Sequence, residues 1–228
     1  MANIPASNTQ PQELAIFGGT FDPIHLGHVA CAQHIVDWLQ LNELRLMPSH
    51  IPPHKAGTHA SAAQRLEMAK LAIAKNNKLS IDARELNKNS PSYTSETLAD
   101  FAAQLPNCRL YFVIGFDSLL TFTRWHNWQQ ILQLAHIVVC TRPGYQLTDA
   151  NSETLKLLSE YQVNSLDEIK LAQSGNIIFA PVIEQDIASS DIRQTLKNLW
   201  QSAHLSQSSP LPLPTSVIDY IEHNGLYK

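Results

Sequence analysis

The amino-acid sequence predicts an α/β fold, with a doubly wound, mostly parallel sheet that carries helices on both faces. Short apolar runs alternate along the chain with segments whose apolar residues recur at helical spacing. This repeated strand-then-helix order is typical of parallel sheets that are covered on both sides. The chain of 228 residues is 44% hydrophobic and 16% charged, so it is long and apolar enough for one sizeable core.

Six strands and six helices are predicted along the chain. The predicted strands are Leu14–Phe17, Glu43–Met47, Leu79–Arg84, Arg109–Ile114, His136–Thr141 and Asn176–Phe179. The predicted helices are His28–Leu39, Ser61–Lys75, Ser95–Gln104, Trp128–Leu134, Ser190–Leu199 and Thr215–Glu222. Ligands of doubly wound sheets bind outside the carboxyl ends of the strands, so the turns that follow the strands are where a site is expected.

The domain organisation is predicted to be simple. Residues 13–228 form a single domain, with helices from residue 190 onward, after a flexible tail over residues 1–12. The tail contains prolines and small polar residues, and it lacks both the basic start and the apolar core of a signal peptide. The polar, helix-biased stretch Tyr145–Gly175 lies between two predicted strands and indicates an insertion or small lobe.

Composition and charge argue against several classes of protein. The formal net charge is −4, so there is no basic surplus to hold a nucleic acid backbone. No apolar run approaches the length that spans a bilayer, and no basic amphipathic segment indicates a membrane surface. The three cysteines lie far apart without a C-x-x-C pair, which argues against a zinc site and favours a reducing compartment, the cytoplasm.

One turn carries the strongest functional signal in the chain. It runs from Gly18 to His28, between the first predicted strand and the first predicted helix. Gly18 and Gly19 allow the backbone to bend and to approach a ligand closely. The helix that follows offers unpaired N–H groups and a positive dipole end to an anion. His25 and His28 lie on one side of the first helical turn, where both imidazoles can donate to a phosphate.

A second phosphate cradle is predicted at the start of the helix Ser190–Leu199. Ser189 and Ser190 are favourable residues at a helix start, and Arg193 lies one turn further on. A planar, permanently charged guanidinium suits a phosphate group. Taken alone, the segment better fits an ordinary capped helix with a solvated arginine. Beside the histidine turn, the phosphate cradle is the stronger interpretation.

Three further segments contain candidate binding residues. Lys55 lies on a proline-rich loop, where a positive charge fits a phosphate contact and a solvated surface equally well. Gly115 ends a predicted strand and allows close approach, and Asp117 either accepts from ribose hydroxyls or caps the next helix. Trp125 is interpreted as a platform for an aromatic ring, and Trp128 as part of the core.

The two phosphate-binding segments resemble the signatures of the nucleotidylyltransferase superfamily. Residues 19–28 fill every position of the pattern G-x-F-x-P-x-H-x-x-H, between a strand and a helix as that pattern requires. Residues 187–193 are similar to the second signature, I-S-S-T-x-I-R. In that segment Ala188 replaces the first serine and Ser190 replaces the threonine, so one hydroxyl contact is lost while the arginine is retained.

Other segments resemble one branch of that superfamily, the bacterial nicotinate-nucleotide adenylyltransferases. They are P-P-H-K at residues 52–55, S-Y-T-S-E-T-L at residues 92–98, and I-G-F-D at residues 114–117 followed by W-H-N-W. Glu96 stands where the branch usually has Asp. The resemblance extends from about residue 14 onward, and it implies a Rossmann-like fold.

This resemblance implies transfer of AMP from ATP to nicotinate mononucleotide, giving nicotinate adenine dinucleotide and pyrophosphate in NAD biosynthesis. Mg²⁺ is implied as the companion of ATP, and no protein ligand for a metal is assigned. The implied catalytic residues are His25 and His28. The implied ATP-binding residues are Gly18, Gly19, Thr20, Phe21, Gly115, Asp117, Ser189, Ser190 and Arg193. The implied substrate-binding residues are Lys55, Thr94, Trp125 and Asp22, with Asp22 either orienting Lys55 or contacting a metal.

Three alternatives remain at this stage. The same motifs fit an adenylyltransferase that acts on nicotinamide mononucleotide, because the two substrates differ only by an acid and an amide on one ring. They also fit, less well, an enzyme that acts on phosphopantetheine, since its family members are shorter and lack the W-x-x-W and P-P-H-K segments. A nucleotide-binding sensor without catalysis is a third possibility, and the intact pair His25 and His28 argues against it.

Overall fold

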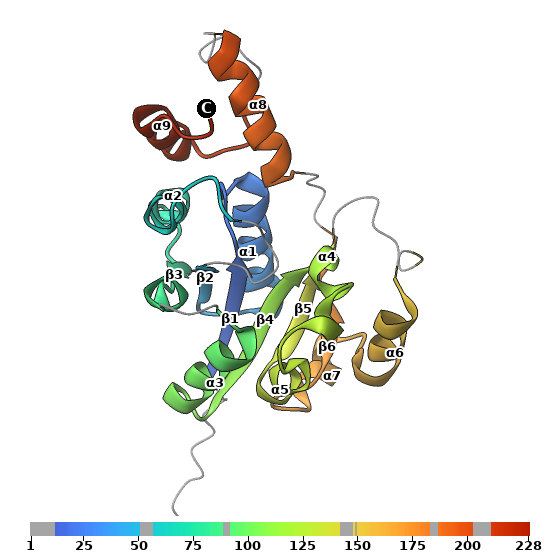
Figure 1. Cartoon of the computed structure of the whole chain (residues 1–228). Helices are drawn as coiled ribbons and strands as arrows, with labels where there is room; N and C mark the ends of the chain where they lie inside the picture. Colours follow the sequence, from blue (N-terminus) through green and yellow to red (C-terminus); the bar gives the residue numbers. More distant parts are fainter. Residues whose placement is uncertain are drawn as a thin grey trace, which may run out of the picture.

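The computed structural model describes residues 12–50, 57–88, 92–141, 148, 150–182, 187–202 and 211–228. Across these residues, six strands form one parallel sheet in the order β3-β2-β1-β4-β5-β6, with helices packed on both faces (Figure 1). The chain winds outward in one direction from β1 to β3 and in the other from β4 to β6. The predicted α/β, doubly wound, Rossmann-like fold is therefore confirmed.

Each predicted strand and helix has a counterpart in the structure. The strands are β1 (Gln12–Gly19), β2 (Leu44–Pro48), β3 (Leu79–Ile81), β4 (Cys108–Gly115), β5 (His136–Cys140) and β6 (Ile177–Phe179). The helices are α1 (Leu26–Leu39), α2 (Ala62–Ile73), α3 (Thr94–Gln104), α4 (Phe116–Leu119), α5 (Trp128–Leu134), α6 (Ser152–Tyr161), α7 (Leu166–Lys170), α8 (Ser189–Ser202) and α9 (Thr215–Asn224). Two short 3-10 helices, η1 (Arg84–Asn87) and η2 (Phe122–Arg124), follow β3 and α4.

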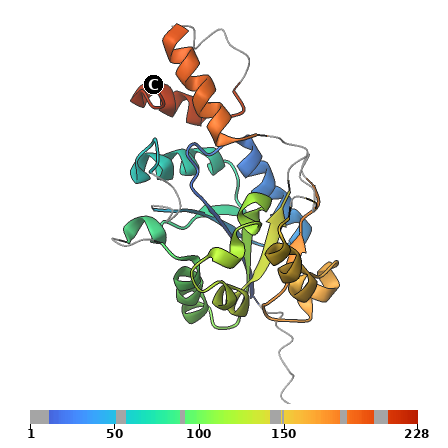
Figure 2. The ribbon, with the colours of Figure 1, turned by 45° about the vertical axis from the view of Figure 1, so that its right-hand side comes forward.

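The pleat of the strands sorts the apolar side chains into two cores, one on each face of the sheet. In β1, Ala15 and Phe17 belong to one core and Leu14 and Ile16 to the other, because successive residues of a strand point to opposite sides. Buried residues of α1, α2, α7, α8 and α9 complete the first core, and those of α3, α4, α5 and α6 the second. Figure 2 shows α8 and α9 together at the end of the molecule nearest α1 and α2.

The third strand is shorter than predicted, because the chain turns out of the sheet after Ile81. The Asp82 carboxylate accepts a hydrogen bond from the backbone N–H of Arg84 at 3.0 Å and one from Arg84 Nε at 2.9 Å. An aspartate that binds the backbone two residues ahead favours a turn over a strand. Arg84, predicted as the last residue of this strand, therefore begins η1 instead.

The predicted insertion forms the crossover between β5 and β6. Leu157 and Leu158 of α6 are buried in one core, and Ile169 of α7 is buried in the other. Residues 142–147 and 149 lie outside the described residues, as do residues 1–11 of the predicted tail. The last residue of the predicted tail, Gln12, belongs instead to the sheet, as the first residue of β1.

Over the described ranges, no helix is both long and apolar enough to cross a membrane.

A buried histidine lies at the start of β5. It is at the amino ends of the strands, opposite the carboxyl ends that are followed by the predicted motifs. His136 is fully buried, its Nδ1 accepts from the backbone N–H of Asn176 at 3.2 Å, and its Nε2 lies 3.2 Å from the carbonyl oxygen of Ala172. These partners suit a neutral ring with its proton on Nε2. Burial lowers the pKa of His136 from 6.5 to about 4.

We predict that the free energy of unfolding falls as the pH is lowered from about 6.5 to 4, because the unfolded chain then binds a proton that native His136 refuses. At pH 4.5 this loss amounts to roughly 2–3 kcal/mol. Urea unfolding at pH 7 and pH 4.5 measures it. In His136→Gln the difference between the two pH values is expected to shrink by about that amount. The exposed His223→Gln serves as the control, and an equal change in both variants would contradict the assignment.

Candidate active site

A cleft of about 1020 Å³ opens at the carboxyl ends of the central strands. Its wall contains the first predicted motif, through Gly18, Gly19, Thr20, Phe21, Asp22, His25 and His28. It also contains the other predicted site residues that the structure describes, which are Thr94, Gly115, Asp117, Trp125, Ser189, Ser190 and Arg193. Lys55 lies outside the described residues. Motifs far apart in the sequence thus meet in one place, where α1 and α8 begin and β4 and β5 end.

The two histidines cap the first helix reciprocally. His25 is the N-cap residue of α1, and its Nδ1 accepts from the backbone N–H of His28 at 3.3 Å. In return, Nδ1 of His28 accepts from the backbone N–H of His25 at 3.3 Å, and the rings stack with centroids 3.6 Å apart. Because both Nδ1 atoms accept, a neutral ring carries its proton on Nε2. The helix therefore begins two residues before the predicted His28, and the cap fixes the tautomer of each ring.

Phe21 packs its ring against the histidine pair. Its ring meets that of His28 edge to face, with centroids 5.0 Å apart, and its backbone adopts the left-handed conformation with φ of 49°. A Cβ atom at Gly19 would lie 2.6 Å from the Phe21 ring, so only glycine fits there. The second glycine of the motif thus makes room for the aromatic ring that packs on His28.

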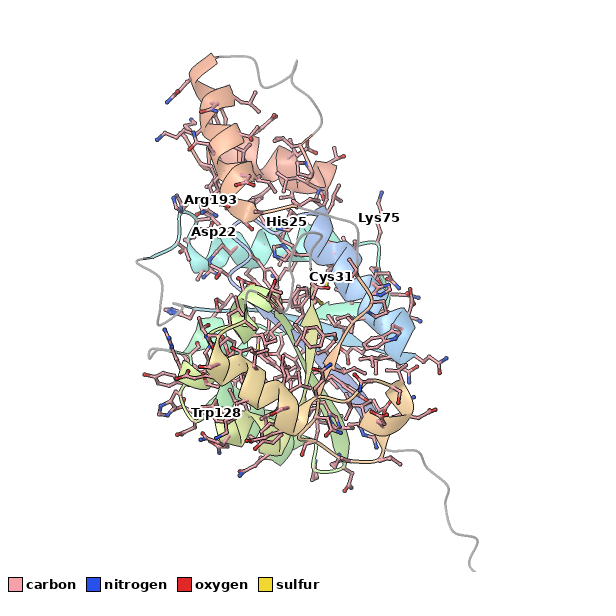
Figure 3. All side chains as sticks on the ribbon, turned by 90° about the vertical axis from the view of Figure 1, so that its right-hand side faces the viewer. Asp22, His25, Cys31, Lys75, Trp128 and Arg193 are labelled. Carbon is pink, nitrogen blue, oxygen red and sulfur yellow. The ribbon has the colours of Figure 1, made fainter. Side chains whose placement is uncertain are left out.

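Helix α8 is fastened directly to the histidine turn. Ser189 Oγ donates to the carbonyl oxygen of Pro23 at 3.0 Å, and Arg193 Nη1 donates to that of Asp22 at 2.7 Å. Figure 3 shows Arg193, Asp22 and His25 gathered at the base of α8, whereas Trp128 lies far from them. The two predicted phosphate cradles are therefore adjacent, and hydrogen bonds fix the distance between them.

Asp22 is the point at which several elements meet. Its side chain is only 5% exposed, and Oδ2 accepts from the backbone N–H of His59 at 2.7 Å. Oδ1 accepts from the backbone N–H of Ala60 at 3.1 Å and from the Tyr227 hydroxyl at 2.8 Å. The carboxylate is thus used to join the turn to the loop before α2 and to the segment after α9.

Arg65 of α2 holds the same turn on its other side. Its Nη1 donates to the carbonyl oxygen of Thr20 at 2.6 Å, and its Nη2 donates to that of His50 at 2.9 Å. The side chain is fully buried, and this burial lowers the pKa of Arg65 from its usual value, while the nearby Asp22 opposes the shift. A guanidinium remains charged under such a shift, so Arg65 supplies a buried positive charge beneath the turn.

The end of β4 forms a second part of the cleft. Gly115 ends this strand and precedes α4, and a Cβ atom there would lie 2.5 Å from Oδ1 of Asp117. The Asp117 carboxylate thus folds back over the glycine, on the exposed rim of the cleft. Beside Gly115 on the neighbouring strand β5 lies Cys140, whose thiol is 2.7 Å from that of Cys31 on α1 without forming a disulfide.

A third part of the cleft lies where α3 begins. Thr94 is the first residue of α3, and the side chain of its N-cap residue, Tyr93, makes no capping hydrogen bond, so backbone N–H groups at this helix start can serve a ligand. Trp125 lines the cleft with its ring 5.5 Å from that of Phe122. Trp128 packs against the second core, as predicted, with its ring 6.1 Å from that of Phe122.

Sequence reasoning missed several residues of this third part. Arg124 and His126 flank Trp125 in the wall of the cleft, and the His126 ring lies 4.4 Å from that of Tyr93. Glu85 of η1 also lines the cleft; burial raises its pKa, while the Thr97 hydroxyl, 3.0 Å away, opposes the shift by donating to it. For Arg124 and His126, the signal in the sequence was their place beside Trp125 in the W-x-x-W segment, whereas Glu85 lies far from that segment and had no such signal.

No metal centre is built from protein side chains within the described part of the chain, where no three His, Cys, Asp or Glu residues are grouped to hold an ion. Mg²⁺ is commonly bound through few carboxylates together with the phosphates of its substrate. The donor set of the cleft, which consists of helix N-termini, imidazoles and a guanidinium, suits the phosphate oxygens of such a complex.

Comparisons with known proteins identify the family of the chain. A sequence model of the cytidylyltransferase-like family matches residues 16–195. A protein of Shewanella pealeana named "Probable nicotinate-nucleotide adenylyltransferase" is 41% identical over 217 residues, which are 95% of this chain and 96% of the relative. A protein of Psychromonas ingrahamii with the same name is 39% identical over 219 residues, which are 96% of this chain and 99% of the relative.

Solved structures share the fold. Nicotinic acid mononucleotide adenylyltransferase of Plasmodium falciparum, in complex with NaAD, superposes with a TM-score of 0.68 at 18% identity, over 95% of this chain and 97% of that one. The same enzyme in complex with APC gives a TM-score of 0.66 over the same shares. At this low identity, the likeness to the solved structures shows the fold alone. The family is shown by the sequence relatives.

Proposed function

The chain belongs to the nicotinate-nucleotide adenylyltransferase family, and we propose that it transfers the AMP part of ATP to nicotinate mononucleotide. The products are nicotinate adenine dinucleotide and pyrophosphate. The observation that carries this proposal is the convergence of two phosphate-binding helix starts, at His25 and Ser189, with the openings at Gly115 and Thr94 in one cleft. Such a cleft has room and donors for two nucleotides at once.

The reaction is a substitution at phosphorus. An oxygen of the mononucleotide phosphate forms a bond to the α-phosphorus of ATP, and the bond between that phosphorus and the bridging oxygen breaks. Pyrophosphate leaves with the electron pair. This chemistry needs alignment and stabilisation of charge more than a covalent intermediate. The residues of the cleft are therefore assigned to holding and neutralising phosphates.

His25 and His28 are assigned to the reacting phosphates. Their Nε2 protons and the N-terminus of α1 offer hydrogen bonds where negative charge grows in the transition state. The capping bonds through Nδ1 hold both rings in one orientation before substrate arrives. Glycines 18 and 19, with Thr20 and Phe21, form the backbone that supports ATP at this point.

The β- and γ-phosphates are assigned to the start of α8. A guanidinium has five N–H donors, so Arg193 can hold the Asp22 carbonyl and a phosphate together. Ser189 and Ser190 add hydroxyls at the same helix end. Mg²⁺ bound to these phosphates would neutralise the charge that develops on the leaving pyrophosphate.

Gly115 and Asp117 are assigned to the adenosine half of ATP. The exposed Asp117 carboxylate can accept from ribose hydroxyls at the rim of the cleft. The nicotinate half is assigned to Thr94 and Trp125, with Lys55 as a further phosphate or substrate contact.

An acidic ring substituent fits the third part of the cleft better than an amide does. The N-terminus of α3 favours negative charge, and the cation Arg124 lies in the same wall. Glu85, an acid in the same wall, has a pKa that burial raises, which reduces its repulsion of a carboxylate. Both features support nicotinate over nicotinamide mononucleotide.

The first test is pyrophosphate release from ATP and Mg²⁺ with three separate acceptors: nicotinate mononucleotide, nicotinamide mononucleotide and phosphopantetheine. We expect kcat/KM to be at least about tenfold higher with nicotinate than with nicotinamide mononucleotide, because hydrogen bonds to a charged group are worth more than neutral ones. Preference for either other acceptor would keep the phosphate sites and reject the assigned nicotinate pocket. A folded protein that binds ATP without releasing pyrophosphate would be a sensor.

His28→Ala is predicted to lower kcat by about 10²-fold or more, the effect of removing one transition-state donor. It also removes one capping bond, which costs about 1 kcal/mol of stability, so the variant is expected to fold. The matched control is His34→Ala on the same helix, outside the cleft wall. Steady-state pyrophosphate release measures both, and near-normal turnover of His28→Ala would refute the catalytic assignment.

Arg193→Ala is predicted to raise the KM for ATP by roughly 10- to 100-fold, the range for losing a charge-assisted hydrogen bond. Arg193→Lys should recover part of the affinity, because it restores the charge but not the planar fork. Lys197→Ala removes a cation from the exposed face of the same helix as the control. An ATP KM that stays the same in Arg193→Ala would argue against the cradle on α8.

A further inference from the structure

Tyr227, which follows α9, reaches the turn that bears the catalytic histidines. Its hydroxyl donates to Oδ1 of Asp22 at 2.8 Å, and its side chain is almost completely buried. Asp22 precedes His25 by three residues and is joined to it by Pro23 and Ile24, which are also buried. A residue near the end of the chain is therefore one hydrogen bond and three residues away from the N-cap of α1.

The backbone around Tyr227 is fixed from two sides. Gly225 ends α9 in the left-handed conformation, and the N–H of Leu226 donates to the carbonyl oxygen of Ile221 at 3.0 Å. Trp200 Nε1 of α8 donates to the carbonyl oxygen of Leu226 at 2.9 Å. The hydroxyl of Tyr227 is thus presented to Asp22 by a turn anchored to the helix that carries the second phosphate cradle.

Tyr227 also has a backbone conformation that a large side chain rarely adopts, with φ of 63°. Such conformations persist where the surroundings impose them, and they gather at functional sites. Burial raises the pKa of the Tyr227 hydroxyl above its usual range, with the Asp22 charge acting in the same direction, so the group remains a donor. The conformation serves to place this donor against a buried carboxylate.

We propose that Tyr227 is a positioning residue for AMP transfer, which acts by holding Asp22 and thereby the histidine turn in register with the start of α8. This inference rests on the proposed function. Two bonds set that register: the Tyr227 hydroxyl on the Asp22 carboxylate, and the Arg193 guanidinium on the Asp22 carbonyl. The first bond is made by the segment after α9 and the second by α8. Helices α8 and α9 with that segment thus hold Asp22 through both its carboxylate and its backbone carbonyl.

A positioning role differs from a purely structural one in what it changes. Displacing a catalytic group by about 1 Å can cost as much as 10²-fold in rate, because the attacking oxygen, the phosphorus and the donors must be aligned. Binding of either nucleotide draws on many contacts in the cleft and is much less sensitive to such a displacement. Loss of the Tyr227 hydroxyl is therefore expected to act on kcat and to leave KM nearly unchanged.

The test compares Tyr227→Phe with Tyr220→Phe. Tyr220 lies on α9 and packs against the same core, so its variant also removes one phenolic hydroxyl from this region. We expect Tyr227→Phe to lower kcat about tenfold while both KM values stay within about twofold of the parent, and Tyr220→Phe to match the parent in both parameters. Tyr227→Phe is expected to melt at a lower temperature than Tyr220→Phe, because it removes a donor from a buried carboxylate, so the test depends on the split between kcat and KM and not on stability.

A second measurement does not depend on activity. The imidazole C–H resonances of His25 and His28, assigned through His25→Gln and His28→Gln, are expected to move in Tyr227→Phe and to stay in place in Tyr220→Phe. If the parent enzyme fails to transfer AMP, the proposed function fails, and these resonances alone decide whether Tyr227 positions the turn. Unmoved resonances or an unchanged kcat in a working enzyme would overturn the proposal.

Should Tyr227→Phe fail to fold, Asp22→Glu tests the same link from the other side. It keeps the carboxylate and displaces it by one methylene, so the same loss of kcat with little change of KM is expected. Equal losses of kcat in Tyr227→Phe and Tyr220→Phe would show a general effect on the α8–α9 pair and would overturn the proposal.

Discussion

The buried carboxylate of Asp22 is the constraint on which the site depends. Removing an ionised carboxylate from water costs roughly several kcal/mol in real proteins, and this cost is offset only when good partners surround the charge. Asp22 has three donors on its two oxygens, from His59, Ala60 and Tyr227. The geometry of the turn is therefore tied to the loop before α2 and to the segment after α9, because a shift of any of them leaves a buried charge unsatisfied.

The carbonyl groups of the same turn extend this dependence. The β1–α1 turn has too few residues to satisfy its own backbone, so Thr20, Asp22 and Pro23 accept from arginine and serine side chains of other elements. Two of these donors, Arg193 and Ser189, are also assigned to the phosphates of ATP. The bonds that build the turn thus use the same groups as the bonds proposed for the ligand, which makes folding of α8 against the turn a requirement for a formed phosphate site.

The sequence predicts this fold and the histidine turn well because both are encoded locally. The strand, the two glycines and the two histidines three residues apart determine the local backbone conformation by themselves. The reciprocal cap of His25 and His28 needs no distant partner. By contrast, the partners of Asp22 come from distant parts of the chain: Tyr227 is separated from it by 205 positions. No local pattern marks such a contact, and an aromatic residue after a helix C-cap is predicted simply as packing. The end of β3 was missed for a local reason, since the turn at Asp82 interrupts an alternation of apolar and polar residues that is typical of a strand.

An acidic chain can bind two nucleotides because charge in the cleft is organised locally. The net charge of −4 is spread over the whole chain, and charges beyond about 8–10 Å are largely screened at physiological salt. Inside the cleft the negative charge of the acids is partly compensated. Hydrogen bonds and the buried cation Arg65 stabilise the Asp22 carboxylate, and burial raises the pKa of Glu85. The groups proposed to hold a phosphate are therefore the starts of α1 and α8 with their imidazoles and guanidinium. The net charge consequently argues against binding of a nucleic acid backbone, which needs a broad basic surface. It carries no argument against a nucleotide, which needs only a few aligned donors.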